Sequence, residues 1–322
     1  GYVNEADSRI MEMQIDCAVS HGVNVFIYDW YWYDNRPFLE NCLNDGFLKA
    51  RNNTDMKFCL MWANHNANYL WDKRNSDNDL ETVIWSGVVT PKIFSEICDR
   101  TIEKYFLKEN YYCIDGCPVY MIFDIDNFIR SFGTSDECKK AIEKFRQKTI
   151  DAGFKGLHLQ FVHWRDRIFN WLKDADSQKG VISAQMYEHL GASSVTNYSW
   201  GGITDFDGDF NDIAEGYITE YNKIAPTLTV PYYPNISVGW DDNVRFYKFR
   251  PGVVVNNTPE NFKKACEKIK RLADEGMEKG ILKAPFITVN SWNEWTETSY
   301  LQPDDLYGYS YLEAIKEVFT EE

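Results

Sequence analysis

Short apolar runs alternate with amphipathic segments along almost the whole chain, and this alternation limits the possible folds more than any other feature. The runs are rich in β-branched and aromatic residues and are nearly continuously apolar. This pattern is typical of parallel strands that are covered on both faces. Strands are therefore predicted over residues 23–30, 56–63, 118–124, 156–163, 180–187, 227–233 and 284–291.

Helices are predicted between these runs, and several carry a start signal. Thr90 and Thr258 each precede a proline, which is favoured in the first turn of a helix. Asp304 or Asp305 is the predicted N-terminal cap of the last helix. The predicted helices span residues 5–20, 36–50, 91–109, 134–152, 165–178, 209–223, 257–279 and 306–320.

The order of these elements predicts right-handed βαβ units and therefore a parallel sheet. The sequence has no G-x-G-x-x-G after the first strand and no P-loop, which disfavours a doubly wound nucleotide-binding sheet. Seven strands with eight helices instead indicate an α/β fold of the (β/α)8 TIM-barrel type, whose first strand is expected before residue 1. Residues 1–322 are expected to form one domain, because no linker or low-complexity segment interrupts them.

Charge and composition restrict the class of ligand. A formal net charge of −15 disfavours nucleic acids and anionic lipid surfaces as partners. No stretch approaches the ~18 apolar residues of a membrane span, so membrane insertion is not expected. The aromatic share of 16% is compatible with a large core and, alternatively, with flat platforms beneath sugar rings. We expect a monomer.

The eight cysteines are interpreted mainly as small buried apolar residues. Cys113 and Cys117 are the nearest pair, and no second cluster completes a zinc site, so neither a metal nor another cofactor is expected. Free thiols favour a cytoplasmic location, with a periplasmic or secreted one as the alternative. Residues 205–212 resemble a calcium loop, but Phe210 and Gly216 replace the Gly and Glu of an EF-hand, so a capping loop is favoured.

Polar and aromatic side chains cluster directly after the predicted strands, which is where barrel enzymes carry their chemistry. Alternate side chains of a strand point to opposite faces, so about half of residues 29–33 are expected in the core. His65 is expected to contact substrate rather than zinc. The pocket residues predicted from these positions are Asp29, Tyr31, Trp32, Trp62, Asn64, His65 and Tyr187.

Two glutamates, Glu294 and Glu297, stand three residues apart directly after the last predicted strand. This spacing brings two carboxyls to one face of a turn. Paired carboxylates with separated pKa values are the usual means of cleaving a glycosidic bond, and apolar neighbours raise such a pKa by desolvation. The alternative is structural: Ser291 and Glu294 fit a capping box, and Glu297 fits a solvated face.

The segment SWNEWTETSYLQPDDLYGYSYLEAI resembles the C-terminal signature of the WbsX-like proteins, which are related to glycoside hydrolase family 99, the endo-α-1,2-mannosidases and mannanases. The resemblance implies a (β/α)8 barrel and a retaining α-glycosidase that acts on an oligo- or polysaccharide. In family 99 the first glutamate of N-E-W-x-E removes the proton of the sugar 2-hydroxyl, which forms a 1,2-anhydro sugar. The second glutamate protonates the leaving oxygen and then activates water. Further similar segments, in the same order, are ADSRIMEMQIDCAVSHGVNVFIYDWYWY, MWANHN, IDGCPVYMIF and PNISVGWDD.

Carried onto this chain, the resemblance implies that Glu294 is the base at O2, Glu297 the general acid/base and Asn293 the residue that orients them. Ordinary double displacement by the same two glutamates remains an alternative. The resemblance also implies that the pocket and its subsites are shaped by Trp240, Asp241, Trp292, Trp295 and Tyr300.

This chain departs from the family pattern near the glutamates. Thr296 and Thr298 stand where many members have alanine and glycine, Gln302 where glutamate is common, and His65 where an acidic residue is common. Specificity for mannose therefore rests on analogy alone. Arg165 and Arg245 are expected to pair with the acidic residues at 241 and 242. Two alternatives to a hydrolase stay open: a WbsX-type glycosyltransferase of polysaccharide biosynthesis and a non-catalytic carbohydrate-binding barrel.

Overall fold

The computed structural model describes residues 3–68, 82–164 and 184–320. Five strands pair side by side and all in parallel. In their order across the sheet they are β1 (Val25–Tyr33), β3 (Lys57–Trp62), β7 (Cys117–Ile122), β8 (His158–Val162) and β9 (Ser194–Thr196).

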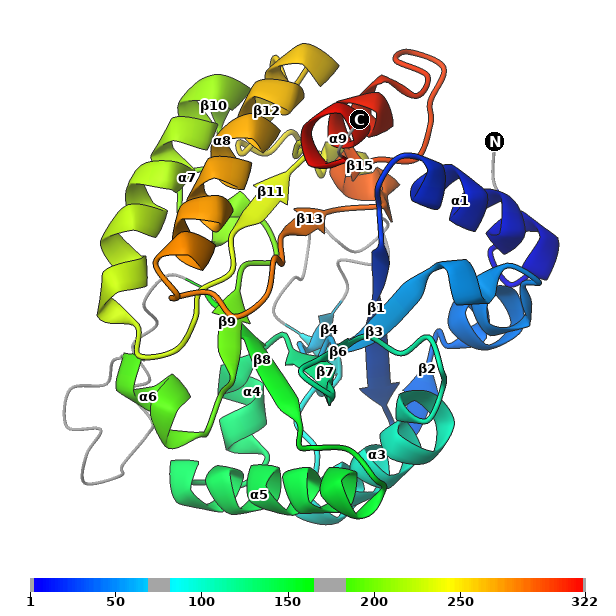
Figure 1. Cartoon of the computed structure of the whole chain (residues 1–322), viewed down its shortest axis with the longest axis vertical. Helices are drawn as coiled ribbons and strands as arrows, with labels where there is room; N and C mark the ends of the chain where they lie inside the picture. The colour runs from blue at the N-terminus through cyan, green and yellow to red at the C-terminus, as the bar shows by residue number, and fades with distance from the viewer. Residues whose placement is uncertain (1–2, 69–81, 165–183, 321–322) are drawn as a thin grey trace.

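The parallel arrangement continues beyond β9. A parallel bridge joins Val195 to Tyr232, and β11 (Asn235–Ser237) pairs in parallel with β13 (Thr288–Asn290). Figure 1 shows these strands in the middle of the molecule, with helices around them. Within the described residues β13 and β1 have no backbone pairing with each other, so the observed architecture is a mixed α/β fold with a largely parallel strand array.

Short antiparallel strands extend the main ones. Strand β2 (Arg36–Phe38) pairs with β1, and β6 (Cys113–Ile114) pairs with β7. The remaining short pairs lie between loops. They are β4 (Ala67–Asn68) with β5 (Val83–Trp85), β10 (Gly208–Asp209) with β12 (Val254–Val255), and β14 (Asn293–Glu294) with β15 (Ser299–Tyr300).

The helices form the outer layer, as Figure 1 shows. The hydroxyls of Thr90 and Thr258 accept hydrogen bonds from the amides of Ile93 and Asn261, so both predicted caps are confirmed. The described helices are α1 (Ser8–Ser20), α3 (Pro91–Thr101), α4 (Ile125–Arg130), α5 (Ser135–Asp151), α6 (Ala184–His189), α7 (Phe210–Ile224), α8 (Pro259–Glu278) and α9 (Ser310–Phe319).

The cap predicted for the last helix is wrong. Helix α9 begins after Tyr309, and Asp304 instead accepts hydrogen bonds from the amides of Leu306 and Tyr307. An aspartate stabilises an isolated turn by the same hydrogen bonds as a helix start, so the local sequence does not distinguish the two.

Three predicted elements differ from the structure. Residues 184–187 of the predicted strand 180–187 belong to helix α6, because a short buried run has the same composition in either state. The sixth strand, β11, begins at Asn235, after the predicted range 227–233. Residues 36–50 form β2 followed by π- and 3₁₀-helical turns rather than one helix. The predicted helix 165–178 lies outside the described residues, as do residues 180–183.

Candidate active site

The two glutamates lie on a tight hairpin that follows β13. Glu294 ends β14, and Glu297 ends a 3₁₀ turn over Trp295–Glu297. Thr298 adopts the left-handed conformation with φ of 53°, which lets the chain return antiparallel as β15. The hairpin therefore presents both carboxyls from one short turn.

The capping box predicted from Ser291 and Glu294 is half formed. The Ser291 hydroxyl accepts a hydrogen bond from the Glu294 amide at 3.2 Å. The Glu294 carboxylate does not return to Ser291: it faces Arg245, with Oε2 3.5 Å from Nη2. The backbone amide of Glu294 thus stabilises the turn, whereas its carboxylate faces Arg245 and takes no part in the capping box.

Arg245 binds the hairpin at several points. It ends a 3₁₀ turn over Asn243–Arg245, and its Nη1 donates to Oε1 of Glu297 at 3.0 Å. Nη2 and Nε both donate to the Thr296 hydroxyl, at 2.7 and 3.0 Å. The expectation that Arg245 pairs with Asp241 or Asp242 is therefore corrected, because its guanidinium is directed to the glutamate hairpin. Arg165 lies outside the described residues.

Burial, and then the charge of the nearby Glu294 carboxylate, raise the pKa of Glu297 to about 7, against the lowering effect of Arg245. Burial also raises the pKa of Glu294, and Arg245 and a hydrogen bond from Tyr198 oppose that rise. Glu297 is 8% exposed, and its Oε2 has no hydrogen-bond partner among the described residues. A carboxyl with a near-neutral pKa and one unbonded oxygen is suited to hold a transferable proton.

Asp29 and Tyr31 lie on one face of β1, close enough to Glu294 and Glu297 for the charges of these glutamates to affect both. Burial, and then the charges of Glu294 and Glu297, hold the pKa of Asp29 well above its usual range. Burial and then Asp29 raise the pKa of Tyr31 far above its usual range. The predicted alternation along this strand is confirmed here, because the intervening Trp30 lies buried in the core.

Tyr198 belongs to the same cluster and was not among the predicted site residues. Burial raises its pKa, and the next causes are the charges of Asp29, Glu297 and Glu294. Tyr198 lies two residues beyond β9, and therefore at a strand end. The sequence places the predicted fifth strand at residues 180–187 instead, so the strand-end position of Tyr198 follows only from β9.

An edge-to-face chain of rings extends this cluster across neighbouring strand ends. The ring of Tyr31 lies 5.9 Å from His65, and His65 lies 5.5 Å from Phe123. Phe123 in turn lies 5.0 Å from Trp164 and 5.3 Å from Tyr198. His65 therefore lies beside Tyr31, and Phe123 and Trp164 extend the same cluster of rings.

Three predicted pocket residues serve the framework instead. Trp62 is fully buried and stacks on Phe94 of α3 at 5.9 Å. The Asn64 side chain accepts from the Asp124 amide and donates to the Asp124 carbonyl, which ties the end of β3 to the end of β7. Tyr187 lies in α6, and its hydroxyl is hydrogen-bonded to Nδ1 of His163 at 2.9 Å. Trp62 is not in the pocket because alternate side chains of β3 point to opposite faces, and Trp62 points toward the helices. Tyr187 is not at a strand end because its segment is a helix rather than the predicted strand.

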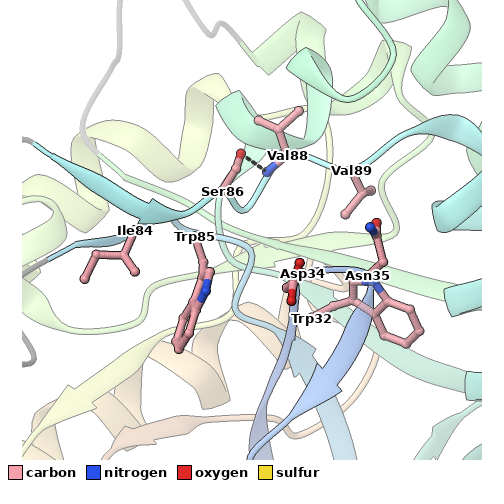
Figure 2. A pocket seen from close by; sticks show the side chains of 8 residues that line it. All are labelled: Trp32, Asp34, Asn35, Ile84, Trp85, Ser86, Val88 and Val89. Atoms are coloured by element: carbon pink, nitrogen blue, oxygen red, sulfur yellow. Dashed lines mark hydrogen bonds between the residues drawn. The ribbon is translucent and has the colours of Figure 1, made fainter.

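Trp32 lies on the opposite face of β1 from Tyr31, beside a separate cavity of about 280 Å³. Figure 2 shows Trp32 at the end of β1 and Trp85 on β5 at this cavity. Neither glutamate is among its lining residues, which are Trp32, Asp34, Asn35, Ile84, Trp85, Ser86, Val88 and Val89.

The aromatic residues beside the glutamates in the sequence pack on other side chains. Trp292 packs on Phe26 at 5.0 Å and donates to the Gln14 side chain at 2.7 Å. Trp295 stacks on Tyr300 at 3.8 Å and is half exposed. Trp292 thus packs between the hairpin and α1, whereas Trp295 and Tyr300 stack on each other.

Asn293 also points to the back of the hairpin. Its side chain donates to both carboxylate oxygens of Glu5, at 3.0 and 3.1 Å. Any orienting effect of Asn293 on Glu294 therefore passes through the backbone of β14.

The segment that carries Trp240 and Asp241 is tied directly to the glutamate turn. The Asp241 amide donates to the Glu297 carbonyl at 2.8 Å, and the Thr298 hydroxyl donates to the Asp241 carbonyl at 2.9 Å. The Asp241 carboxylate accepts from Asn243, and Trp240 stacks on Phe206 at 5.7 Å. This connection explains how Arg245 reaches the glutamates.

Two aspartates of residues 205–212 accept hydrogen bonds from backbone amides. Asp209 caps α7, and Asp207 accepts hydrogen bonds from the amides of Gly252 and Val253. Across the part of the chain that the structure describes, no group of three side chains is arranged to hold a metal ion. None of the described helices is both long and apolar enough to cross a membrane.

The fold is shared with glycoside hydrolase-like proteins. A solved structure titled glycoside hydrolase-like protein matches with a TM-score of 0.62 at 17% identity, over 100% of this chain and 88% of that chain. The GH99 endo-alpha-mannosidase from Bacteroides thetaiotaomicron matches with a TM-score of 0.57 at 12% identity, over 98% of this chain and 80% of that chain.

The sequence model of the family described as Glycosyltransferase WbsX matches residues 1–315, and the chain belongs to this family. Two curated relatives, both described as uncharacterized protein WxcX, come from Xanthomonas campestris pv. campestris strains B100 and ATCC 33913. Each is 22% identical over 328 residues, which cover 99% of this chain. The chain spans 42% of the length of these relatives.

Proposed function

We propose that the protein is a retaining glycoside hydrolase that cleaves an internal α-linkage of a mannan-like or bacterial surface polysaccharide. The observation that carries the proposal is the pair of buried glutamates that share Arg245, one of them with a pKa of about 7. The likeness of the fold to GH99 endo-alpha-mannosidase supports the same conclusion and the choice of an α-linked substrate. We further propose that the parallel strands belong to a (β/α)8 barrel.

In the proposed first step, Glu297 donates its proton to the glycosidic oxygen while the bond from C1 to that oxygen breaks. Glu294 removes the proton of the 2-hydroxyl, and O2 attacks C1 to form a 1,2-anhydro sugar. In the second step Glu297 removes a proton from water, the water oxygen attacks C1 as the bond from C1 to O2 breaks, and Glu294 returns its proton to O2. Two inversions at C1 give retention. Direct attack of Glu294 on C1 is the alternative first step for the same pair.

The remaining members of the cluster would bind the sugar. Asp29 has no side-chain hydrogen bond to any described residue, so its oxygens can accept from sugar hydroxyls. Tyr31 and Tyr198 offer hydroxyl groups beside it, and Phe123 and Trp164 offer apolar ring faces for the C–H faces of sugars.

A glycosyltransferase is the second candidate, and the family description favours it. The strand-end sequence Asp124-Ile125-Asp126 offers little for a metal-bound nucleotide sugar. Asp124 caps α4 through the Asn127 amide, and Asp126 pairs with Arg130 at 2.9 Å. The transferase would consume a nucleotide sugar, whereas the hydrolase would not.

The test is product release from a panel of α-mannans and bacterial surface polysaccharides by the parent protein, Glu294→Gln and Glu297→Gln. Glu278→Gln, an exposed change at the end of α8, is the matched control. We expect cleavage by the parent and the control and its loss in both site variants. Absence of cleavage on every glycan, together with equal glycan binding by all four proteins, would leave a binding barrel. Consumption of a nucleotide sugar would establish the transferase.

A further inference from the structure

Arg245 occupies a position between the two carboxyls that the sequence motif does not reveal. It is separated by 49 and 52 positions from Glu294 and Glu297, and its side chain is 20% exposed. Three of its nitrogens are used within this hairpin: Nη1 on Glu297, and Nη2 and Nε on the Thr296 hydroxyl. Nη2 also lies 3.5 Å from Oε2 of Glu294. The guanidinium is therefore held in one orientation.

A planar guanidinium suits this position for a physical reason. Two carboxylates that share a small buried site repel each other, and one of them takes up a proton unless a cation lies between them. Arginine keeps its charge when buried and presents donors in a rigid fork, so it can face two acceptors at fixed angles. Thr296 supplies the third anchor, and this residue is one of the positions where the chain departs from the family pattern.

We propose that Arg245 is a positioning residue for the glutamate pair: it binds Oε1 of Glu297, faces Glu294, and thereby leaves Oε2 of Glu297 as the oxygen that carries the transferable proton. The contact at Oε1 is a hydrogen bond of 3.0 Å, and Oε2 is the oxygen without a described partner. The catalytic consequence of this arrangement rests on the proposed function, whereas the arrangement itself does not.

The protonation of the pair depends on every charged or titratable group that faces it. Asp29 and Tyr31 face it from β1, and Tyr198 from the segment after β9. Asp242, which precedes the Arg245 turn, raises the pKa of Glu297. Among the causes found for the shifts of both glutamates, Arg245 is the cation, and it lowers the pKa of each. Its removal should therefore raise both.

The experiment is a titration of the two carboxyl groups by NMR, with protein labelled at the glutamate side-chain carbon, over about pH 4 to 9. Glu294→Gln and Glu297→Gln assign the two signals. Arg245→Met removes the guanidinium and keeps the bulk of the side chain. Arg250→Met is the matched control, because Arg250 lies on the same loop, is exposed, and stacks over the Phe246 ring instead.

We expect Arg245→Met to move both titration midpoints upward by about one pH unit or more, and Arg250→Met to leave them in place. Arg245→Lys should give a smaller upward shift, because an ammonium keeps the charge and loses the fork. If Arg245→Met does not fold, the titration midpoints of Arg245→Lys alone test the proposal. Unchanged midpoints in the folded Arg245 variant would overturn the proposal. The titration needs no substrate, so a protein that cleaves no glycan would defeat the proposed hydrolase and leave this inference standing.

Discussion

Trp292 and Gln14 are 278 positions apart, and Nε1 of Trp292 donates a hydrogen bond to Oε1 of Gln14 at 2.7 Å. The same oxygen accepts from Nε2 of Gln302 at 3.0 Å. The hairpin that carries both glutamates is thereby fastened from behind to α1. The two catalytic candidates therefore lie on a rigid turn rather than on a free loop.

This fastening predicts that Gln14→Leu lowers the free energy of unfolding by about 1–2 kcal/mol, because two donors lose their shared acceptor. Denaturant unfolding followed by tryptophan fluorescence measures the change. Gln147→Leu, on the exposed face of α5, is the control and should stay within about 0.5 kcal/mol of the parent. Equal destabilisation by the two changes would contradict a special role for Gln14.

Tyr198→Phe should lower kcat/KM by roughly 10- to 100-fold on whichever glycan the parent cleaves. Tyr198 lowers the pKa of Glu294 and so stabilises its charged form, which is the form that acts as the base. The same change should raise the pKa of Glu294 and move the acid limb of the profile upward. Tyr309→Phe, at a half-exposed tyrosine stacked on His21, is the control. Equal kcat/KM values for the two variants would show that the Tyr198 hydroxyl has no role in catalysis.

The pH–rate profile of kcat/KM should fall as pH rises through about 7. Burial and the neighbouring Glu294 raise the pKa of Glu297 to about 7, and only its protonated form can donate to the leaving oxygen. An aryl glycoside with an acidic phenol needs no such proton, so its basic limb should weaken or vanish. Steady-state rates on both substrates measure the difference. A basic limb that is identical for the two substrates would show that Glu297 is not the general acid.

The lowered pKa of Glu40 predicts that the stability of the fold also depends on pH. Burial alone would raise its pKa, but hydrogen bonds from Arg100, Trp30 and Tyr105 outweigh burial and lower the pKa to about 2. A carboxyl whose pKa is lowered on folding stabilises the fold above its unfolded pKa, which for Glu40 is 4.5, and this contribution is lost as pH falls from there toward 2.

Glu40→Gln should therefore lower the free energy of unfolding at pH 7 by roughly 2 kcal/mol, with a smaller difference from the parent as pH falls below about 4.5. Thermal or denaturant unfolding at several pH values checks it. The exposed pair of Lys140 and Glu137 offers Glu137→Gln as the control. A difference that stays constant down to acid pH would show that Glu40 acts by packing rather than by charge.

The sequence predicted correctly those strands and helix starts that a few neighbouring residues specify. The apolar runs at β1, β3, β7 and β8 and the threonine–proline starts of α3 and α8 are confirmed. The run at 180–187 was wrong, because burial against a helix and burial in a sheet select similar side chains. The fifth strand is β9 instead, so the strand end that carries Tyr198 could not be located from the sequence.

The sequence by itself determined the α/β alternation, the family and the adjacent positions of Glu294 and Glu297, because periodicity and short spacing are local properties of a chain. Only the tertiary structure decided what surrounds those glutamates. It brought Asp29, Tyr198 and Arg245 to them from three distant segments and turned Trp292, Asn293 and Trp295 to the back of the hairpin. A side chain's direction depends on the register and twist of its strand and on the partners that folding supplies, and none of these is written in the neighbouring residues.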